Sequence, residues 1–291
     1  MHPGPPEYVA GRPHPALAGL VLRCTGYRES AAAPVRRRQA PHGGCTLIVG
    51  LGPALRLHGP AGPLVGRSFL AGMHDRAVVT EFTGAQEGVQ VDLAPLGVHV
   101  LLGRPGADLT DRCPPLDALD VPALAALPDR VAAADGWAAR FAAVDDALLG
   151  LLAAARTRPD PEVERAWRRL VRTGGATPVG ELARDVGWSR RHLLTRFTAQ
   201  VGLGPKTAGR VLRFRRAAAL LVPVPVDGRP VPPVRRSIAD VAAACGYADQ
   251  AHLAREFRDL AGCPPSAYVA QWAAASDPFK SPGAQRATLG P

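Results

Sequence analysis

An internal repeat in the C-terminal part of the chain constrains the fold more than any other feature. The two copies read ELARDVGWSRRHLLTRFTAQVGLGP at residues 181–205 and DVAAACGYADQAHLAREFRDLAGCPP at residues 240–265. Matching residues lie 59 positions apart up to the aromatic residue and 60 positions apart after a one-residue insertion. Small, glycine, aromatic, leucine and phenylalanine residues keep their order, so the repeat predicts two copies of one folding unit.

Each copy predicts two helices that are joined by a tight turn. A small residue in the first helix, Ala183 or Ala242, lets a second helix approach closely. The glycine that follows, Gly187 or Gly246, stands where a chain that leaves a helix needs positive φ. In the second helix a leucine and a phenylalanine at i and i+4 face inward. This pattern is typical of a helix-turn-helix, in which the second helix lies in the major groove of DNA.

Several polar residues of the repeat have expected local roles. Ser189 suits the N-cap of the second helix in the first copy, and Ala248 or Asp249 stands near the start of that helix in the second copy. For Glu256 we consider two roles, a pair with a neighbouring arginine or a limit on non-specific attraction to phosphate. His252 is expected to face the core or to cap locally.

The basic excess of the chain is concentrated in the same region. Residues 1–159 hold 15 basic and 14 acidic side chains, a net of +1, whereas residues 160–272 hold 18 and 10, a net of +8. A localised basic excess is the electrostatic footprint of a nucleic-acid binder. A helical repeat that only packs would explain the inward-facing leucines and phenylalanines but not the arginine-rich outer faces, so we favour DNA binding.

Residues 160–272 resemble the DNA-binding domain of AraC/XylS-family bacterial transcription regulators. The resemblance is carried by GWSRRHLLTRF in the first copy and by GYADQAHLAREFRDLAGCPPSAYV in the second. It implies seven helices, with helix-turn-helix units at residues 178–200 and 237–261 that a long helix at residues 207–221 joins. It also implies that both second helices enter successive major grooves on one face of bent DNA, about 34 Å apart.

The resemblance also implies which residues contact DNA. Arg191 suits a bidentate contact with guanine, Gln250 suits adenine, and Arg255 suits guanine or a phosphate. Leu194 offers only an apolar contact, for example with a thymine methyl group, where many relatives have a polar residue. For each arginine the competing interpretation is an ordinary solvated face. The full expected set is Ser189, Arg190, Arg191, Leu194, Thr195, Arg213, Arg216, Gln250, Ala251, Ala254 and Arg255.

Within that set, Arg190, Arg213 and Arg216 suit phosphate positioning better than base reading. The segment at residues 222–236, VPVPVDGRPVPPVRR, departs from the family pattern because it is long and proline-rich. Proline ends the preceding helix by residue 221 or 222. We favour a solvated loop over a loop that contacts DNA.

The N-terminal half predicts a small sheet. VLRCTGY, CTLIVGL, ALRLHG, AVVTEFTG, GVQVDLAP and VHVLLG are typical of short strands between Gly/Pro turns, and their spacing favours a small β-barrel or sandwich. Residues 46–57 and 77–93 are expected to be hairpins. More weakly, residues 67–97 resemble regulatory domains of some family members from high-GC bacteria, which look like small cupin-type β-barrels.

A helical pattern follows at residues 116–155, with an apolar stripe at Trp137, Phe141, Val144, Leu148 and Leu151. The stripe packs either on its own domain, which we favour, or on a partner's copy. The expected fold class is α+β with several domains: a flexible arm at 1–15, a cupin-like β-barrel with following helices at 16–158, an all-α double helix-turn-helix domain at 160–272 and a disordered tail at 273–291.

Motifs for other classes of protein are missing from the sequence. Five widely spaced cysteines without a CxxC pattern indicate reduced thiols, mostly in the core, of a cytoplasmic protein. No signal peptide or membrane span is indicated. His42, His58, His74 and His99 form no HxH or HExxH pattern and are expected in loops or at the surface, and no nucleotide or hydrolase motif occurs. We therefore expect no enzyme activity, cofactor or bound metal.

The sequence thus favours a DNA-binding regulator whose N-terminal domain responds to a small effector. The effector would need unequal affinity for two arrangements of the domains. The alternative is an effector-independent regulator whose N-terminal domain serves dimerisation or protein interaction. A pocket in the sheet domain would favour the first, and an interior filled by its own side chains the second. Double-stranded promoter DNA is the expected partner, with an effector, RNA polymerase and a second copy of the chain as further candidates.

Overall fold

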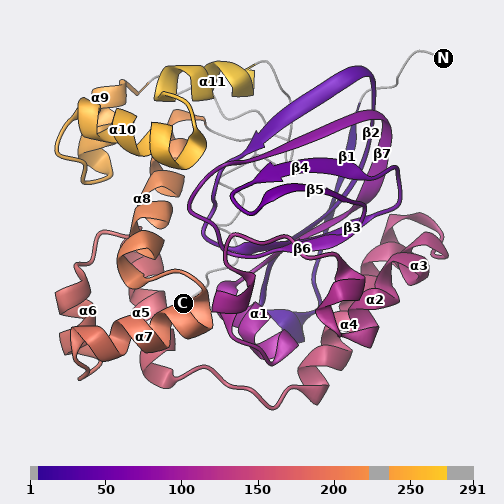
Figure 1. Ribbon diagram of the computed structural model, residues 1–291, viewed down its shortest axis with the longest axis horizontal. Helices are drawn as coiled ribbons and strands as arrows, with labels where there is room; N and C mark the ends of the chain where they lie inside the picture. The colour runs from indigo at the N-terminus through magenta and orange to yellow at the C-terminus, as the bar shows by residue number, and fades with distance from the viewer. Residues whose placement is uncertain (1–5, 223–235, 274–291) are drawn as a thin grey trace.

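The computed structural model describes residues 6–222 and 236–273. One antiparallel sheet with a set of covering helices forms the N-terminal part, and the C-terminal part is entirely helical (Figure 1). The expected tail at residues 274–291, the proline-rich stretch at residues 223–235 and residues 1–5 lie outside the described residues. Within those residues no helix combines the length and the apolar character that crossing a bilayer requires.

Seven strands pair in the order β1-β2-β7-β3-β6, and β4 lies between β7 and β5. Every pair is antiparallel. The strands are β1 (Glu7–Gly11), β2 (Val21–Gln39), β3 (Cys45–Gly50), β4 (Leu55–Gly59), β5 (Gly62–Gly66), β6 (Phe69–Ala71) and β7 (Val78–Leu93).

The sheet does not close into the expected barrel among the described residues. Closure would require strands β1 and β6, at the two ends of the pairing order, to bond to each other. The free edge of β6 is instead covered by a nearby loop, because Leu70 and Gly72 donate to the carbonyls of Pro114 and Arg112 at 3.0 Å each. The sheet-rich N-terminal domain is therefore confirmed, and the closed barrel is corrected to an open curved sheet.

Neither expected hairpin forms. Residues 78–93 are one continuous strand, β7, and Gly84 with φ +81° lies opposite a register shift between Ala31 and Val35 of β2. The glycine therefore accommodates a bulge where a reversal was predicted. Strands β3 and β4 do not pair with each other either, because both bond to the same edge of β7.

The predicted strand VHVLLG is wrong, because these residues belong to helix α1 (Pro95–Leu102). Pro95 opens the helix, and Gly103 closes it with φ +64°. Six of the eight residues are buried, so the run is apolar on nearly all sides, and periodicity does not distinguish a buried helix from a buried strand.

The expected arm at residues 1–15 is wrong for residues 7–11, which form strand β1 against β2. The 3-10 helix η1 (Pro15–Leu17) follows, and Leu17 is fully buried. The chain between the sheet and the C-terminal part forms five further helices. They are η2 (Gly106–Leu109), η3 (Leu116–Leu119), α2 (Pro122–Ala125), α3 (Leu127–Ala132) and α4 (Gly136–Ala154).

Helix α4 carries the predicted apolar stripe and packs on its own domain, as favoured from the sequence. A Cβ at Gly26 of β2 would lie 2.4 Å from the Trp137 ring, and one at Gly11 of β1 would lie 3.0 Å from the Phe141 ring. These two glycines therefore leave the room that the aromatic side chains of α4 fill.

The C-terminal part has seven helices among its described residues, which confirms the number that the family resemblance implies. They are α5 (Pro161–Arg172), α6 (Val179–Asp185), α7 (Arg190–Val201), α8 (Pro205–Leu221), α9 (Ile238–Ala244), α10 (Gln250–Ala261) and α11 (Pro265–Ala273). Helix α8, called the connector helix below, runs between α5–α7 and α9–α11 (Figure 1).

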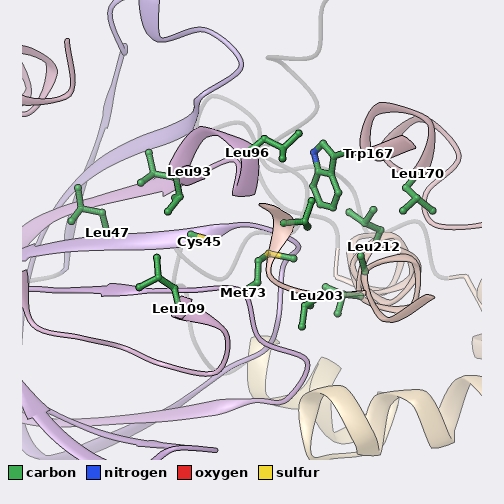
Figure 2. Close-up of a cluster of buried hydrophobic side chains, with 14 of the residues drawn as sticks. Cys45, Leu47, Met73, Leu93, Leu96, Leu109, Trp167, Leu170, Leu203 and Leu212 are labelled. Carbon is green, nitrogen blue, oxygen red and sulfur yellow. The ribbon is translucent and has the colours of Figure 1, made fainter. Parts of the chain in front are cut away.

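The two parts of the chain share one buried hydrophobic cluster. Figure 2 shows Met73 of the sheet domain beside Leu203 of the helical part, and Cys45, Leu47 and Trp167 belong to the same cluster. Thr110 also donates a 2.6 Å hydrogen bond from its hydroxyl to the carbonyl of Gly202. The helix-turn-helix region is thus packed against the sheet domain.

Candidate nucleic-acid interface

The two repeats fold into two helix-turn-helix units with the same local geometry. Helices α6 and α7 form the first unit, and α9 and α10 form the second. Gly187 and Gly246 turn the chain with φ of +71° and +72°. The next amide, of Trp188 or Tyr247, donates to the carbonyl five residues earlier at 3.0 or 2.9 Å. The expected use of positive φ at both glycines is confirmed.

Both second helices begin with a side-chain cap. Ser189 Oγ accepts from the amide of His192 at 3.1 Å, and Asp249 Oδ1 accepts from the amide of His252 at 2.6 Å. Asp249, rather than Ala248, is therefore the N-cap of α10. Each histidine ring lies edge-on to the aromatic residue before its helix, at centroid distances of 4.5 and 5.2 Å.

The leucines and phenylalanines of the repeat anchor these helices. Leu193 and Phe197 of α7 are fully buried, as are Leu253 and Phe257 of α10. The Phe257 ring packs on the Phe214 ring of the connector helix with centroids 4.7 Å apart. Because these side chains fix the inward face, the opposite face of each helix points to solvent.

The outward faces carry most of the residues that the sequence nominates for DNA contact. On α7, Arg191, Leu194 and Thr195 are exposed, and 51% of the surface of Leu194 is accessible. The Thr195 hydroxyl donates back to the Arg191 carbonyl at 3.1 Å. On α10, Gln250, Ala251 and Arg255 are exposed and Ala254 is half-buried.

The three arginines nominated for phosphate contact occupy different environments. Arg216 is exposed on the connector helix. Arg213 is half-buried, and its guanidinium carbon lies 5.4 Å from the centroid of the Tyr247 ring. Exposed Arg190 lies over α6, where a Cβ at Gly180 would be 2.7 Å from its Nη2. Arg213 is thus also part of the packing of the second unit.

Ion pairs hold both second helices. Arg196 of α7 donates to both carboxylate oxygens of Asp160, at 2.7 and 2.8 Å, which lowers the pKa of that carboxyl group. Arg210 of the connector helix donates to buried Glu256 of α10 at 2.9 Å and approaches Asp259 at 3.3 Å. Of the two roles considered for Glu256, the structure shows the pair with an arginine.

A cavity of about 170 Å³ lies between the sheet and the helical part. Phe69 of β6 and Phe82 of β7 contribute apolar walls. Phe214 and Ala218 of the connector helix and Tyr268 of α11 border the same space. We call it the interdomain cavity, because residues of both parts of the chain line it.

The cavity walls carry more positive than negative side chains. Their charged residues are Arg23, Arg37, Arg38, Arg215, Glu29 and Asp92. Arg23 pairs with Asp92 at 2.7 Å. Arg37 pairs with Glu29 at 2.5 Å. Two guanidinium groups, those of Arg38 and Arg215, therefore have no carboxylate partner among the described residues.

Burial lowers the pKa of two groups at the cavity. Arg215 donates to the backbone carbonyl of His42 at 3.3 Å, and burial lowers its pKa to about 10, so it stays a cation at neutral pH. Burial also lowers the pKa of His42 to about 4, so this ring is neutral there. The described residues hold no group of three or more His, Cys, Asp or Glu that could bind a metal ion.

Comparison with known proteins identifies the type of the helical domain. A family model for a helix-turn-helix domain of the AraC type matches residues 182–271, which cover both units and the connector helix. The C-terminal part of the chain is therefore an AraC-type DNA-binding domain. A second model, a domain of unknown function (DUF6597), matches residues 11–115. No curated protein matches the chain.

Solved structures similar to this chain include the following three. The C-terminal domain of AraT, a response regulator from Geobacillus stearothermophilus, has 20% identity and a TM-score of 0.34, covering 40% of this chain and 88% of its own. The DNA-binding domain of AdpA in complex with a target DNA has 28% identity and a TM-score of 0.33, covering 40% and 95%. ToxT from Vibrio cholerae has 9% identity and a TM-score of 0.46, covering 84% and 95%.

Proposed function

We propose that this AraC/XylS-family regulator binds promoter DNA with both helix-turn-helix units and changes its DNA affinity when a small effector enters the interdomain cavity. The observation that carries the effector is the cavity itself, which has apolar walls and a few polar groups that converge on one space. A domain that served only dimerisation would need no such space, so the cavity favours an effector over the effector-independent alternative.

For DNA, we propose that the outward faces of α7 and α10 read bases while arginines around them hold phosphates. Arg191, Gln250 and Arg255 are exposed and long enough to reach base edges in the major groove. Arg190 and Arg216 are proposed to fix the register through phosphates. A second copy of the chain and RNA polymerase are further proposed partners at the promoter.

Selection of bound sequences from a pool of random duplex DNA, followed by Kd measurements on the selected site, tests the DNA part. We expect a site with two half-sites about one helical turn apart, because we propose that the two units enter successive major grooves. Equal affinity for all sequences would overturn the proposed sequence-specific function.

A thermal-shift screen of the full chain with small cationic, neutral and anionic compounds tests the effector part. We expect at least one compound to raise the Tm and to change the Kd for the selected DNA site. A compound that binds without changing DNA affinity would contradict the effector role, and a screen without binders would favour the effector-independent alternative.

A further inference from the structure

The sheet domain contacts α7 and α10 at the same position of the repeat. Gly202 is the C-cap of α7, and Gly262 is the C-cap of α10. The two glycines lie 60 residues apart, at matching positions of the two copies, and their φ angles are +99° and +67°. On both helices the side chains proposed to face DNA precede the C-cap, so a contact at the C-cap can hold each helix without covering its DNA-facing side.

The contact at the C-cap of α7 is close-packed. Thr110, the C-cap of η2, donates from its hydroxyl to the Gly202 carbonyl at 2.6 Å. A Cβ at Gly202 would lie 3.1 Å from the carbonyl oxygen of Gly106 and 3.3 Å from the Cβ of Met73. A Cβ at Gly106 would in turn lie 2.5 Å from the carbonyl oxygen of Gln200. Main chain meets main chain here, and such close packing resists displacement of α7 relative to the sheet domain.

The contact at the C-cap of α10 is made by one side chain, that of Arg38 on β2. A Cβ at Gly262 would lie 3.6 Å from the Nε of Arg38 and 3.9 Å from its Cδ. The Nη1 atom of this arginine is buried without a hydrogen-bond partner among the described residues. The C-terminal end of a helix carries a partial negative charge, so the end of α10 offsets part of the cost of burying this cation. Arg38 therefore ties α10 to β2.

The connector helix by itself restrains α10 more directly than α7. On α10, Phe257 packs on Phe214 of the connector helix and Glu256 pairs with Arg210. Helix α7 packs on η2 and α1 of the sheet domain as well as on α5, and a turn with two glycines at residues 202–204 joins it to the connector helix. Because glycine adopts many backbone conformations, this turn is a weak restraint. The position of α7 relative to α10 therefore depends on the sheet domain.

We propose that the sheet domain sets the half-site spacing that this protein accepts on DNA, with Thr110 and Arg38 as positioning residues at the two C-caps. The inference rests on the proposed binding of DNA by both helix-turn-helix units. One added or removed base pair shifts a half-site by about 3.4 Å and rotates it about the duplex axis by about 35°. Two helices held by one rigid domain cannot follow that change, whereas a helix freed from its C-cap contact can tilt toward the new position.

Kd measurements of the full chain on a series of duplexes test the proposal. The series holds the selected site and versions of it with one or two base pairs added or removed between unchanged half-sites. The native chain should bind the selected site at least about twentyfold more tightly than any altered duplex, because a misplaced unit loses its base contacts. A loss of stability alone would lower the active fraction equally for every duplex and leave this ratio of affinities unchanged.

Variants assign the spacing preference to the two C-cap contacts. Thr110→Val, which loses the hydroxyl at nearly the same volume, and Arg38→Gln should each lower the ratio at least about threefold. Thr110→Ser keeps the hydroxyl, and Arg36→Gln changes an exposed neighbour on β2 that pairs with Glu81, so both controls should keep the native ratio. If one of the two test variants does not fold, as judged by circular dichroism, the other carries the test.

An unchanged ratio in the folded variants would overturn the proposal and assign the spacing to the connector helix. Tighter binding of every duplex by the variants would also overturn it, because the C-cap contacts would then oppose DNA binding. If the native chain selects a DNA sequence but binds all spacings equally, the inference fails and the proposed DNA-binding function stands. If the native chain selects no sequence from the random pool, that function fails as well.

Discussion

Arg191 and Arg213 carry the same charge but lie in different environments, and their expected contributions to DNA binding differ for that reason. Arg191 is exposed on the outward face of α7, with its guanidinium free to turn toward a base. Arg213 lies half-buried against the ring of Tyr247, 5.4 Å from its centroid. We therefore propose that the first discriminates between sequences and that the second contributes both charge and packing.

Arg191→Ala should weaken binding only where the selected site has the base that Arg191 reads. Loss of a bidentate contact costs about 1–3 kcal/mol. Kd measurements on the selected site and on single-base variants check this, with Arg165→Ala, an exposed arginine of α5, as the control. An equal loss on every duplex would assign Arg191 to phosphate contact instead.

Arg213→Ala should weaken binding evenly across sequences and also lower the Tm. Removing one phosphate contact reduces the slope of log K against log salt by about 1, and losing the contact with Tyr247 costs about 0.5–1 kcal/mol of stability. Exposed Arg216 is the comparison, since Arg216→Ala should change the salt slope and leave the Tm unchanged. An unchanged Tm in Arg213→Ala would contradict the packing role.

At the scale of elements, the two helix-turn-helix units share a turn and a fold but are tied to the rest of the molecule by different ion pairs. Arg196 joins α7 to Asp160 at the start of α5. Arg210 of the connector helix joins α10 through Glu256. The second unit also depends on a carboxylate cap, whereas the first uses the hydroxyl of Ser189.

Asp249→Ala should destabilise the chain by about 1 kcal/mol, because the first turn of α10 loses its side-chain acceptor. Urea unfolding followed by circular dichroism measures the change. Asp249→Asn keeps an acceptor and is the matched control, so an equal loss in both variants would show that the cap is not the cause.

At the scale of the whole molecule, the interdomain cavity is where the sheet domain and the DNA-binding helices contact the same space. His42 lies there in the loop between β2 and β3, and its Nε2 atom is buried without a hydrogen-bond partner among the described residues. Protonation of this ring would add a cation beside Arg215 and Arg23, whose charges lower the pKa of His42. The charge of Asp92 raises that pKa instead.

The stability of the chain should fall as the pH falls from 6.5 toward about 4, the interval between the ordinary pKa of histidine and that of buried His42. Burial lowers this pKa, so the unfolded chain takes up the proton first, and the stabilisation is complete above pH 6.5 and lost below it. Urea unfolding at pH 7, 6 and 5 measures the loss. His42→Asn should reduce this loss of stability, whereas His58→Asn, at an exposed histidine, should leave the loss unchanged. An unchanged pH dependence in His42→Asn would contradict the prediction.

The N-terminal sheet shows why part of this fold could not be predicted from the sequence. Gly84 indicated a turn, yet a glycine with positive φ serves equally well in a bulge within a long strand. The run from Val98 to Gly103 suits a strand or a buried helix, and only packing on all sides selects the helix. Pairing partners far apart along the chain decide both outcomes.

The sequence by itself determined the two helix-turn-helix units, because their caps, turns and inward leucines act within a few residues and occur twice. The nomination of Arg191 and Gln250 for DNA contact came from the family resemblance of these motifs. Only the tertiary structure decided the interdomain cavity, since Arg38 and Arg215 are brought to one space by long-range packing of the sheet on the connector helix. A local sequence pattern does not predict such a contact, because burial depends on the whole fold.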